Sequence, residues 1–363
     1  MIHSEVPSVH DNRASQRPIV VGTWPGLSFK SNEFVRTFAQ SLIDEGCTVV
    51  DVTNPAGVRD RLDVLHVHWP ELVFWQYGRR LGKALDIFRT FRAIRRMQRC
   101  GTRVVWMVHN LRPHDLSGLR RRIWPYIERF MLHHSDGFMT LAPSTIDVVH
   151  RTYPQLATRP AAAALHPVYR RIAGLPDRAA CRADLSLAAE VKVFALPGLL
   201  RPYKGTEALI TAFLQNRDPD NRLLIAGNPI SRDYGAAITA LAAGDPRIVL
   251  KFGFLDDWEF AMCLEAADCV VLPYQSSLHS GALVHALSYG RMVITPAAPF
   301  ANDIAKAVGN QWVDCYQGDL KSEIFERRDW PAGLPDLTSL QPREMGRTAT
   351  AFYRSLVYSR SGA

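Results

Sequence analysis

Two cationic side chains stand close together in the segment Gly198-Leu-Leu-Arg-Pro-Tyr-Lys-Gly205. A short apolar run precedes this segment and predicts a strand, and the residues after it have the apolar spacing of a helix. Arg201 and Lys204 would then lie at a strand-to-helix turn, where Gly205 lets the backbone approach a ligand. Two cations and the amide groups of a helix N-terminus suit a diphosphate, because both stabilise negative charge. An ordinary surface turn explains the same residues equally well.

The same arrangement recurs in Leu272-Pro-Tyr-Gln-Ser-Ser-Leu-His-Ser-Gly281. A strand is expected to end before Tyr274, and a helix is expected to begin near Ser280 and Gly281. Small residues at a helix start leave its amides open to a phosphate or sugar oxygen. A serine that only caps the helix explains Ser280 equally well. Two such helix starts in one half of the chain favour ligand binding at both.

Six titratable side chains follow two predicted strands of the first half: His66, His68, Glu71, His109, His114 and Asp115. A single such histidine is more often a hydrogen-bonded structural residue, but six at adjacent strand ends favour a role in proton transfer. Asp115 and Glu71 are the preferred bases, because a carboxylate accepts a proton without first having to be neutral. His114 is the third candidate.

The elements that must position these residues alternate between short apolar strands and helices. Strands are expected at residues 18–23, 48–52, 62–67, 104–109, 137–141, 159–169, 191–198, 222–227, 248–253, 269–274 and 292–296, with a linker at residues 174–177. This alternation predicts parallel sheets with helices on both faces, in two doubly wound α/β halves. Ligands bind beyond the carboxyl ends of such strands, so the site is expected in the cleft between the halves.

The expected organisation has four parts. Residues 1–17 form a disordered tail, 18–172 a first domain, 173–345 a second domain, and 346–363 a terminal helix in which Tyr353, Leu356 and Val357 share a face. None of the six cysteines has the spacing of a disulfide framework or zinc site, so reduced thiols are expected. The start of the chain has no apolar signal-peptide core, and no apolar run is long enough to span a membrane. A soluble or peripheral protein is therefore expected.

The net charge of +8 is carried by the first half alone. Residues 1–165 hold 22 Lys and Arg against 14 Asp and Glu, whereas residues 166–363 hold 21 of each. Such an excess favours an anionic partner, or serves only solubility. No helix-turn-helix, zinc-finger or RNA-binding motif is present, so nucleic acid is not expected as a partner.

Residues 83–99 read as a basic amphipathic helix. Its apolar members are Leu85, Phe88, Phe91, Ile94 and Met97, and the arginines between them are Arg89, Arg92, Arg95, Arg96 and Arg99. A core helix with a solvated basic face is one interpretation. The other is a surface that rests on anionic lipid, worth about 1 kcal/mol per well-placed cation. In both, the apolar side is expected to pack on the sheet.

Several segments resemble the GT-B glycosyltransferases and, among them, the bacterial exopolysaccharide β-mannosyltransferases of the xanthan-assembly type. They are residues 63–71, 108–115, 198–205, Leu-Ile-Ala-Gly-Asn-Pro at 224–229, Val-Val-Leu-Pro-Tyr at 270–274 and Ser-Gly-Ala-Leu-Val-His-Ala-Leu-Ser at 280–288. The resemblance spans about residues 60–315. It implies two Rossmann-like domains facing a cleft, and a last helix that crosses back to the first domain.

The resemblance also implies an activity. A member of that family transfers mannose from GDP-mannose to a polyprenyl-diphosphate-linked oligosaccharide at the inner face of the cytoplasmic membrane, with inversion of the anomeric carbon. No cofactor or metal is expected. Asp218-Pro-Asp220 has the spacing of a metal-binding pair, but it lies in a polar loop before a strand. UDP-glucose or UDP-glucuronate as donor, and a non-catalytic sugar-nucleotide-binding protein, are the alternatives.

The resemblance assigns roles to single residues. Arg201 and Lys204 would grip the donor diphosphate; Ser280 and Gly281 would lie by the distal phosphate or sugar, close to Tyr274. Ribose and base would be lined by Gly227, Asn228, Gly253 and Phe254. On the first domain, His109 and Asn110 would contact the donor, and the acceptor and membrane face would include His68, Trp69, Arg89, Arg92, Arg95 and Arg96. Retaining relatives carry two glutamates eight residues apart, but Ser277 and His285 occupy those places here, which favours an inverting or an inactive protein.

Overall fold

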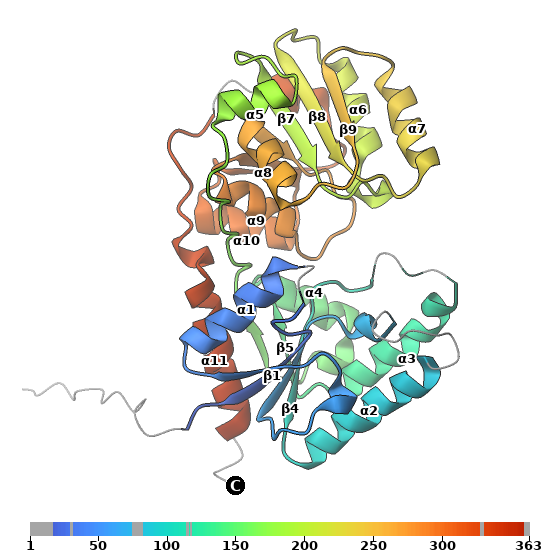
Figure 1. Cartoon of the computed structure of the whole chain (residues 1–363), viewed down its shortest axis with the longest axis vertical. Helices are drawn as coiled ribbons and strands as arrows, with labels where there is room; N and C mark the ends of the chain where they lie inside the picture. Colours follow the sequence, from blue (N-terminus) through green and yellow to red (C-terminus); the bar gives the residue numbers. More distant parts are fainter. Residues whose placement is uncertain are drawn as a thin grey trace, which may run out of the picture.

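The computed structural model describes residues 17–29, 32–74, 83–113, 116, 118–326 and 330–358. These residues form two six-stranded sheets, each flanked by helices (Figure 1). Every strand pairing is parallel. The expected pair of doubly wound α/β halves is therefore confirmed.

The first sheet has the order β2-β1-β3-β4-β5-β6. Its strands are β1 (Val20–Trp24), β2 (Thr48–Asp51), β3 (Val64–Val67), β4 (Arg103–Met107), β5 (Gly137–Thr140) and β6 (Ala161–Ala163). The four residues of β3 are all buried, as expected for a central strand covered on both faces. The strand order reverses between β1 and β3, which places the loops after Trp24 and Val67 at the point where doubly wound sheets bind ligands.

The second sheet has the order β12-β11-β10-β7-β8-β9. Its strands are β7 (Lys192–Pro197), β8 (Asn221–Gly227), β9 (Ile248–Phe252), β10 (Cys269–Val271), β11 (Met292–Pro296) and β12 (Val313–Tyr316). Strand β12 was not expected from the sequence. The order reverses between β7 and β10, and the two loops that follow these strands are the two segments with ligand-binding character in the sequence.

Eleven α-helices cover the sheets in the described part of the chain. They are α1 (Glu33–Asp44), α2 (Lys83–Arg99), α3 (Gly118–His134), α4 (Thr145–Thr152), α5 (Arg178–Asp184), α6 (Thr206–Gln215), α7 (Arg232–Ala242), α8 (Asp257–Ala266), α9 (Gly281–Ser288), α10 (Pro299–Val308) and α11 (Pro342–Tyr358). Helix α1 shows how local signals set the bounds, because the Asn32 side chain caps its first turn.

Helix α2 corrects one expectation from the sequence. Its buried face contains Ile87, Thr90, Ile94 and Met97, whereas Leu85 and Phe88 are 58% and 61% exposed. The expected stripe included Leu85 and Phe88 because they share the helical spacing of Ile94 and Met97. Packing of Ile87 and Thr90 against the domain instead turns these two residues outward.

Helix α11 runs from the second half down the side of the first half (Figure 1). The Thr350 hydroxyl lies 3.4 Å from the Cys47 thiol, and the Tyr353 hydroxyl lies 2.6 Å from Nδ1 of His66. At the other end of the chain, residues 1–16 of the expected tail lie outside the described residues. Arg17, which was counted with that tail, forms a bidentate ion pair with Asp63 at 2.6 and 2.7 Å.

Candidate active site

The turn after β7 lies against the loops after β8 and β10. Four residues that were predicted to bind the donor meet there: Arg201, Lys204, Asn228 and Tyr274. The Arg201 guanidinium donates hydrogen bonds to the carbonyl oxygens of Leu200 and Asn228, at 3.0 and 3.1 Å. The Lys204 ammonium lies 5.2 Å from the ring centre of Tyr274, over the face of that ring. The turn after β7 and the loops after β8 and β10 therefore meet at the reversal point of the sheet.

Gly205 has a packing role that the sequence did not predict. It has a φ of +71° and separates the short 3-10 helix Pro202–Lys204 from α6. A side chain at this position would overlap the carbonyl oxygen of Pro273. Gly205 therefore allows the turn to pack against the loop after β10.

The loop after β8 forms part of a second concave surface. Asn228 and Gly253 line a pocket of about 480 Å³ between β8, α7 and β9. The Gly253 amide donates to the Gly227 carbonyl at 3.1 Å, so the two loops lie side by side. Phe254 is 76% exposed beside them. An exposed ring at a loop junction can stack on a planar base, as the resemblance implies for this residue.

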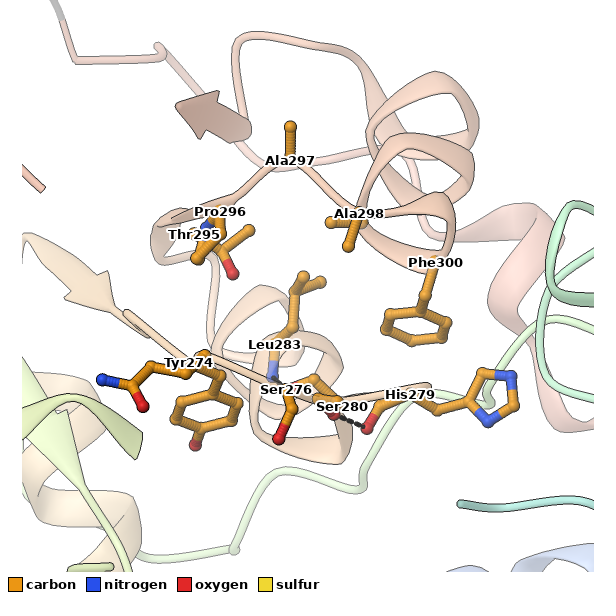
Figure 2. A pocket seen from close by; sticks show the side chains of 13 residues that line it. Tyr274, Ser276, His279, Ser280, Leu283, Thr295, Pro296, Ala297, Ala298 and Phe300 are labelled. Atoms are coloured by element: carbon orange, nitrogen blue, oxygen red, sulfur yellow. Dashed lines mark hydrogen bonds between the residues drawn. The ribbon is translucent and has the colours of Figure 1, made fainter. Parts of the chain in front are cut away.

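The loops after β10 and β11 enclose a pocket of about 210 Å³ at the start of α9 (Figure 2). Its lining includes Tyr274, Ser277, Ser280, Leu283 and Phe300. The Ser280 hydroxyl accepts a hydrogen bond from the Leu283 amide at 3.3 Å, so Ser280 caps the helix. The Tyr274 hydroxyl is buried and has no hydrogen-bond partner within the described residues.

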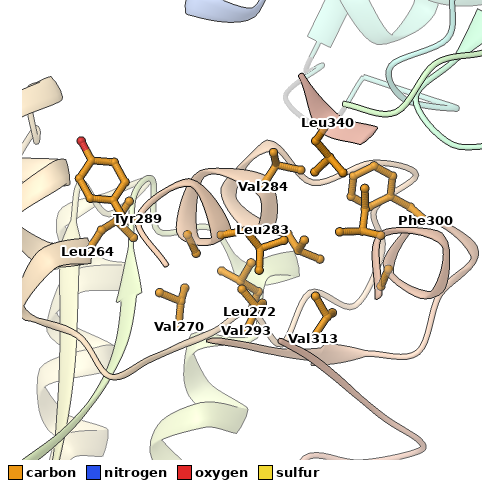
Figure 3. Packing of buried hydrophobic residues seen from close by; sticks show 14 of the residues in the cluster. Leu264, Val270, Leu272, Leu283, Val284, Tyr289, Val293, Phe300, Val313 and Leu340 are labelled. Carbon is orange, nitrogen blue, oxygen red and sulfur yellow. The ribbon is translucent and has the colours of Figure 1, made fainter. Parts of the chain in front are cut away.

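Helix α9 is held in place by a dry contact with the second sheet. Leu283 and Val284 are buried near Leu272, Val293 and Phe300, in the cluster drawn in Figure 3. A fully buried aliphatic side chain contributes about 1.5–3 kcal/mol to stability. The start of α9, and with it the amide groups of its first turn, is therefore fixed relative to the sheet.

A buried histidine pair follows the ends of β3 and β4 in the first half. His68 Nδ1 and His109 Nε2 share a hydrogen bond of 3.2 Å, and the Trp69 ring stacks on His109 with 4.3 Å between ring centres. Burial lowers the pKa of His68 to about 3 and that of His109 well below its usual value, so both rings are neutral at pH 7. His66 lies inside β3 and shares a hydrogen bond with the Tyr353 hydroxyl, so His66 has a structural role.

Glu71 lies beside this pair, in the 3-10 helix Pro70–Phe74. It lines a small pocket together with His68, Trp69, His109 and Asn110. Burial raises the pKa of its carboxyl from 4.5 to about 7. A carboxyl with this pKa can accept and release a proton near neutrality. The other two predicted catalytic residues, His114 and Asp115, lie outside the described residues.

Hydrogen bonds of two residues from the second half, His279 and Asp303, join the halves next to the site. His279, in the loop after β10, accepts a hydrogen bond from the Leu141 amide at 3.2 Å and donates from Nδ1 to the His109 carbonyl at 3.1 Å. The Asp303 carboxylate accepts hydrogen bonds from the amide and the hydroxyl of Ser144 at 2.8 and 2.6 Å. These contacts hold the loop that precedes Ser280 against the strand end that carries His109.

Ser277 and His285, at the places where retaining relatives carry glutamates, both make contacts within the fold. The Ser277 hydroxyl donates to the His279 carbonyl at 2.5 Å, which shapes the loop. The His285 ring lies between those of Tyr169 and Phe260, with ring centres 4.2 and 4.8 Å away. Burial lowers the pKa of His285 to about 4, so it carries no charge at pH 7. Two uncharged side chains thus occupy the positions of the two glutamates.

The sequence did not reveal His166 and Tyr169, which approach the start of α9 from the connection between the halves. Their segment, Leu165-His-Pro-Val-Tyr169, is expected from the sequence to end the last strand of the first half, but β6 ends at Ala163. The aromatic side chains of this segment were the signal that the sequence offered. Within the described residues, no group of three or more His, Cys, Asp or Glu side chains could hold a metal ion.

The predicted basic face is present on α2 and continues onto α3. Arg89, Arg92, Arg95 and Arg96 are exposed, although Arg89 pairs with Asp86 at 3.4 Å and Arg96 donates to the Val58 carbonyl at 3.1 Å. The two helices are joined by Phe91 and Phe130, whose rings stack with centres 3.8 Å apart. Helix α3 adds two large exposed apolar residues, Leu119 and Tyr126, at 69% and 72%.

Comparison with known proteins identifies the family. The family model described as glycosyl transferases group 1 matches residues 191–316. GDP-mannose:glycolipid 4-beta-D-mannosyltransferase from Xanthomonas campestris pv. campestris is 30% identical over 301 residues, which are 81% of this chain and 79% of that protein. The chain belongs to this glycosyltransferase family. D-inositol 3-phosphate glycosyltransferase from Corynebacterium aurimucosum is 29% identical over 180 residues, 46% of this chain and 40% of that protein.

Solved structures support the GT-B fold of the glycosyltransferase. Sucrose-phosphate synthase from Thermosynechococcus elongatus has a TM-score of 0.58 at 13% identity, covering 95% of this chain and 96% of that one. Anabaena HepE, solved with UDP-glucose, has the same TM-score and identity, with 94% of each chain covered. These similarities confirm the expected fold. In the described part of the glycosyltransferase, no helix is long and apolar enough to cross a membrane.

Proposed function

We propose that this glycosyltransferase moves mannose from GDP-mannose to a polyprenyl-diphosphate-linked oligosaccharide in exopolysaccharide assembly, with inversion at the anomeric carbon. The observation that carries the proposal is its 30% identity, over 81% of the chain, to a GDP-mannose:glycolipid 4-beta-D-mannosyltransferase. The second half then holds the nucleotide sugar, and the first half holds the acceptor.

In this proposal the leaving diphosphate lies between the turn after β7 and the start of α9. Arg201 and Lys204 supply positive charge there, and the first-turn amides of α9 supply oriented donors. A guanidinium grips two phosphate oxygens at once, whereas a lysine acts as a point charge. Each well-placed donor is worth about 3–4 kcal/mol of transition-state stabilisation. This charge stabilises the nucleoside diphosphate as its bond to the sugar breaks.

Glu71 is the proposed general base among the described residues. In a single displacement, the acceptor hydroxyl attacks the anomeric carbon and its proton passes to a base. The pKa of about 7 suits this task, and the neighbouring His68 and His109 are neutral and cannot ion-pair with the carboxylate. The absence of carboxylates at Ser277 and His285 fits an inverting reaction, which needs no second acidic residue at those places.

The acceptor is proposed to reach the site from a membrane surface under α2 and α3. Arginines attract anionic headgroups, each contributing about 1 kcal/mol. Leu85 and Phe88 on α2 are exposed among these arginines, and Leu119 and Tyr126 are exposed on α3. Basic and apolar residues on one face are typical of surfaces that lie in the headgroup region. The glycosyltransferase would then work at the inner face of the cytoplasmic membrane.

A thermal-shift panel of GDP, UDP and their sugars tests the donor. A ligand at a hundredfold excess over its Kd stabilises the folded chain by about 2.7 kcal/mol. GDP-mannose should raise the Tm more than any UDP-sugar, and Arg201→Ala should remove most of the rise. Arg217→Ala, at the opposite end of the second sheet, is the matched control. A larger rise with UDP-glucose or UDP-glucuronate would identify that nucleotide sugar as the donor in place of GDP-mannose. Binding without transfer to a glycolipid would indicate a binding protein in place of an enzyme.

A further inference from the structure

The connection between the two halves reaches the start of α9. An ideal Cβ at Gly281 would lie 2.6 Å from the Tyr169 hydroxyl and 3.4 Å from Nε2 of His166. Cα–Cβ bonds of a helix tilt towards its N-terminus, so atoms at this place lie at the rim of that end. The absence of a side chain at Gly281 therefore lets two polar groups of the connection approach the first turn of α9.

His166 offers a lone pair at this rim. Its Nδ1 lies 2.9 Å from the Pro167 carbonyl oxygen, which can only accept, so Nδ1 carries the proton of the neutral ring. Burial lowers the pKa of His166 to about 4, so the ring is neutral at pH 7. Its Nε2 is then an acceptor and forms no hydrogen bond within the described residues. The residue is only 5% exposed, so bulk water has little access to this acceptor.

Tyr169 offers a hydroxyl beside that lone pair. Burial raises the pKa of this phenol, so the hydroxyl remains protonated and can donate as well as accept. Within the described residues no hydrogen bond engages this hydroxyl, whereas the Tyr169 amide donates to the Ser288 hydroxyl at 3.0 Å. The backbone of the connection is thus tied to α9, and the phenol points towards its start.

A row of rings fixes both side chains. It runs from Phe34 on α1 through His166, Tyr169 and His285 to Phe260 on α8, with successive ring centres 5.0, 5.5, 4.2 and 4.8 Å apart. The row begins in the first half and ends in the second. Rotation of either side chain would break ring contacts, so the two polar groups are pre-positioned at the helix start.

We propose that His166 and Tyr169 form a sugar-reading subsite of the donor site, in which His166 Nε2 accepts a hydrogen bond from a hydroxyl of the transferred sugar and the Tyr169 hydroxyl bonds beside it. A lone pair repels phosphate oxygens, so the chemistry at Nε2 selects a hydroxyl donor. This subsite rests on the proposed function, and it assigns sugar recognition to the connection between the halves. The two acids of retaining relatives are absent, and this pair supplies polar contacts from the connection between the halves.

The test compares GDP-mannose with GDP as ligands of the whole chain. Tyr169→Phe keeps the ring stack and removes one oxygen, and His166→Phe keeps a ring and removes the lone pair. Each variant should bind GDP-mannose about tenfold more weakly and leave GDP affinity unchanged, as expected for loss of one hydrogen bond to the sugar. Tyr289→Phe is the matched control, because its hydroxyl accepts from the Ile172 amide in the same connection at 3.1 Å. It should leave the ratio of the two affinities unchanged.

Three results would overturn the subsite. Equal weakening of GDP-mannose and GDP would indicate a general loss of site structure, and wild-type affinities for both would remove any role in donor binding. Loss of transfer with an unchanged affinity ratio would make His166 a base instead of a sugar contact. Failure of the proposed function is a separate result, because in that case the wild-type chain itself would not prefer GDP-mannose to GDP.

Discussion

Replacing Glu71 with glutamine should stabilise the protein and abolish transfer. A carboxyl whose pKa rises on folding binds its proton more tightly in the folded chain than in the unfolded chain. Its ionisation therefore costs stability, progressively from pH 4.5 to about 7, and the full cost persists above pH 7. At about 1.4 kcal/mol per tenfold change in the ionisation constant, the rise from 4.5 to about 7 corresponds to about 3 kcal/mol. Because Glu71 is not fully buried, this is an upper figure.

The assay is the Tm of wild type and of Glu71→Gln between pH 4 and pH 8.5. The two curves should lie close together at pH 4, and the variant should be several degrees more stable at pH 8. Glutamine cannot ionise, so the variant does not lose the unfolding free energy that the wild type loses when Glu71 ionises. Transfer by the variant should fall by about 10²–10⁴-fold, whereas its affinity for GDP-mannose should not change. Glu190→Gln changes an exposed glutamate just before β7, at the start of the second half; it serves as the control and should alter neither quantity.

Two outcomes would refute this reasoning. If the Tm difference between wild type and variant does not depend on pH, the Glu71 carboxyl does not have a raised pKa in the folded chain. If the variant transfers sugar at the wild-type rate, the base lies elsewhere, and Asp115 becomes the first candidate. In the wild type, transfer should also rise with pH through a midpoint near 7, because only the ionised carboxylate accepts the proton.

Three further predictions concern the donor site, the fold and the membrane surface. Lys204→Ala should lower turnover at least tenfold through weaker stabilisation of the leaving diphosphate, and near-normal steady-state kinetics would end that assignment. Gly227→Ala should lower the unfolding free energy by about 1–3 kcal/mol, since its φ is +146° and a side chain there would overlap a backbone carbonyl; an unchanged Tm would contradict this. Phe88→Ser and Arg92→Gln should each reduce sedimentation with anionic vesicles and spare transfer to a soluble acceptor, whereas unchanged vesicle binding would leave this face simply solvated.

The sheets and their connections could be predicted because each strand carries its own signal. The runs around Val64, Val193 and Val270 are short, apolar and followed by Gly, Pro or His, and each became a buried parallel strand. Two parallel sheets then place the loops after β7 and β10 together. Arg201 and Tyr274 could therefore be assigned to one site from sequence position alone, because the topology of a doubly wound sheet fixes where strand ends meet.

Properties that depend on packing could not be predicted. The spacing of Leu85 and Phe88 matches that of a buried stripe, yet the helix turns another face to the domain. The close approach of Gly205 to the Pro273 carbonyl likewise has no signal in the sequence. In both cases the deciding contact comes from a residue distant in sequence, and periodicity carries no information about it.

The sugar side of the donor site was missed for the same reason, and this bears on how the enzyme can work without the acidic pair. His166 lies 115 positions before Gly281, and only the folded chain brings its lone pair to the start of α9. Ser277 and His285, at the places of the two acids, belong to the second half, whereas His166 and Tyr169 approach from the connection. Inversion requires attack from the side opposite the departing diphosphate, and Glu71 lies in that half. The uncharged residues at Ser277 and His285 are therefore consistent with an active enzyme in which polar groups of the connection contact the sugar.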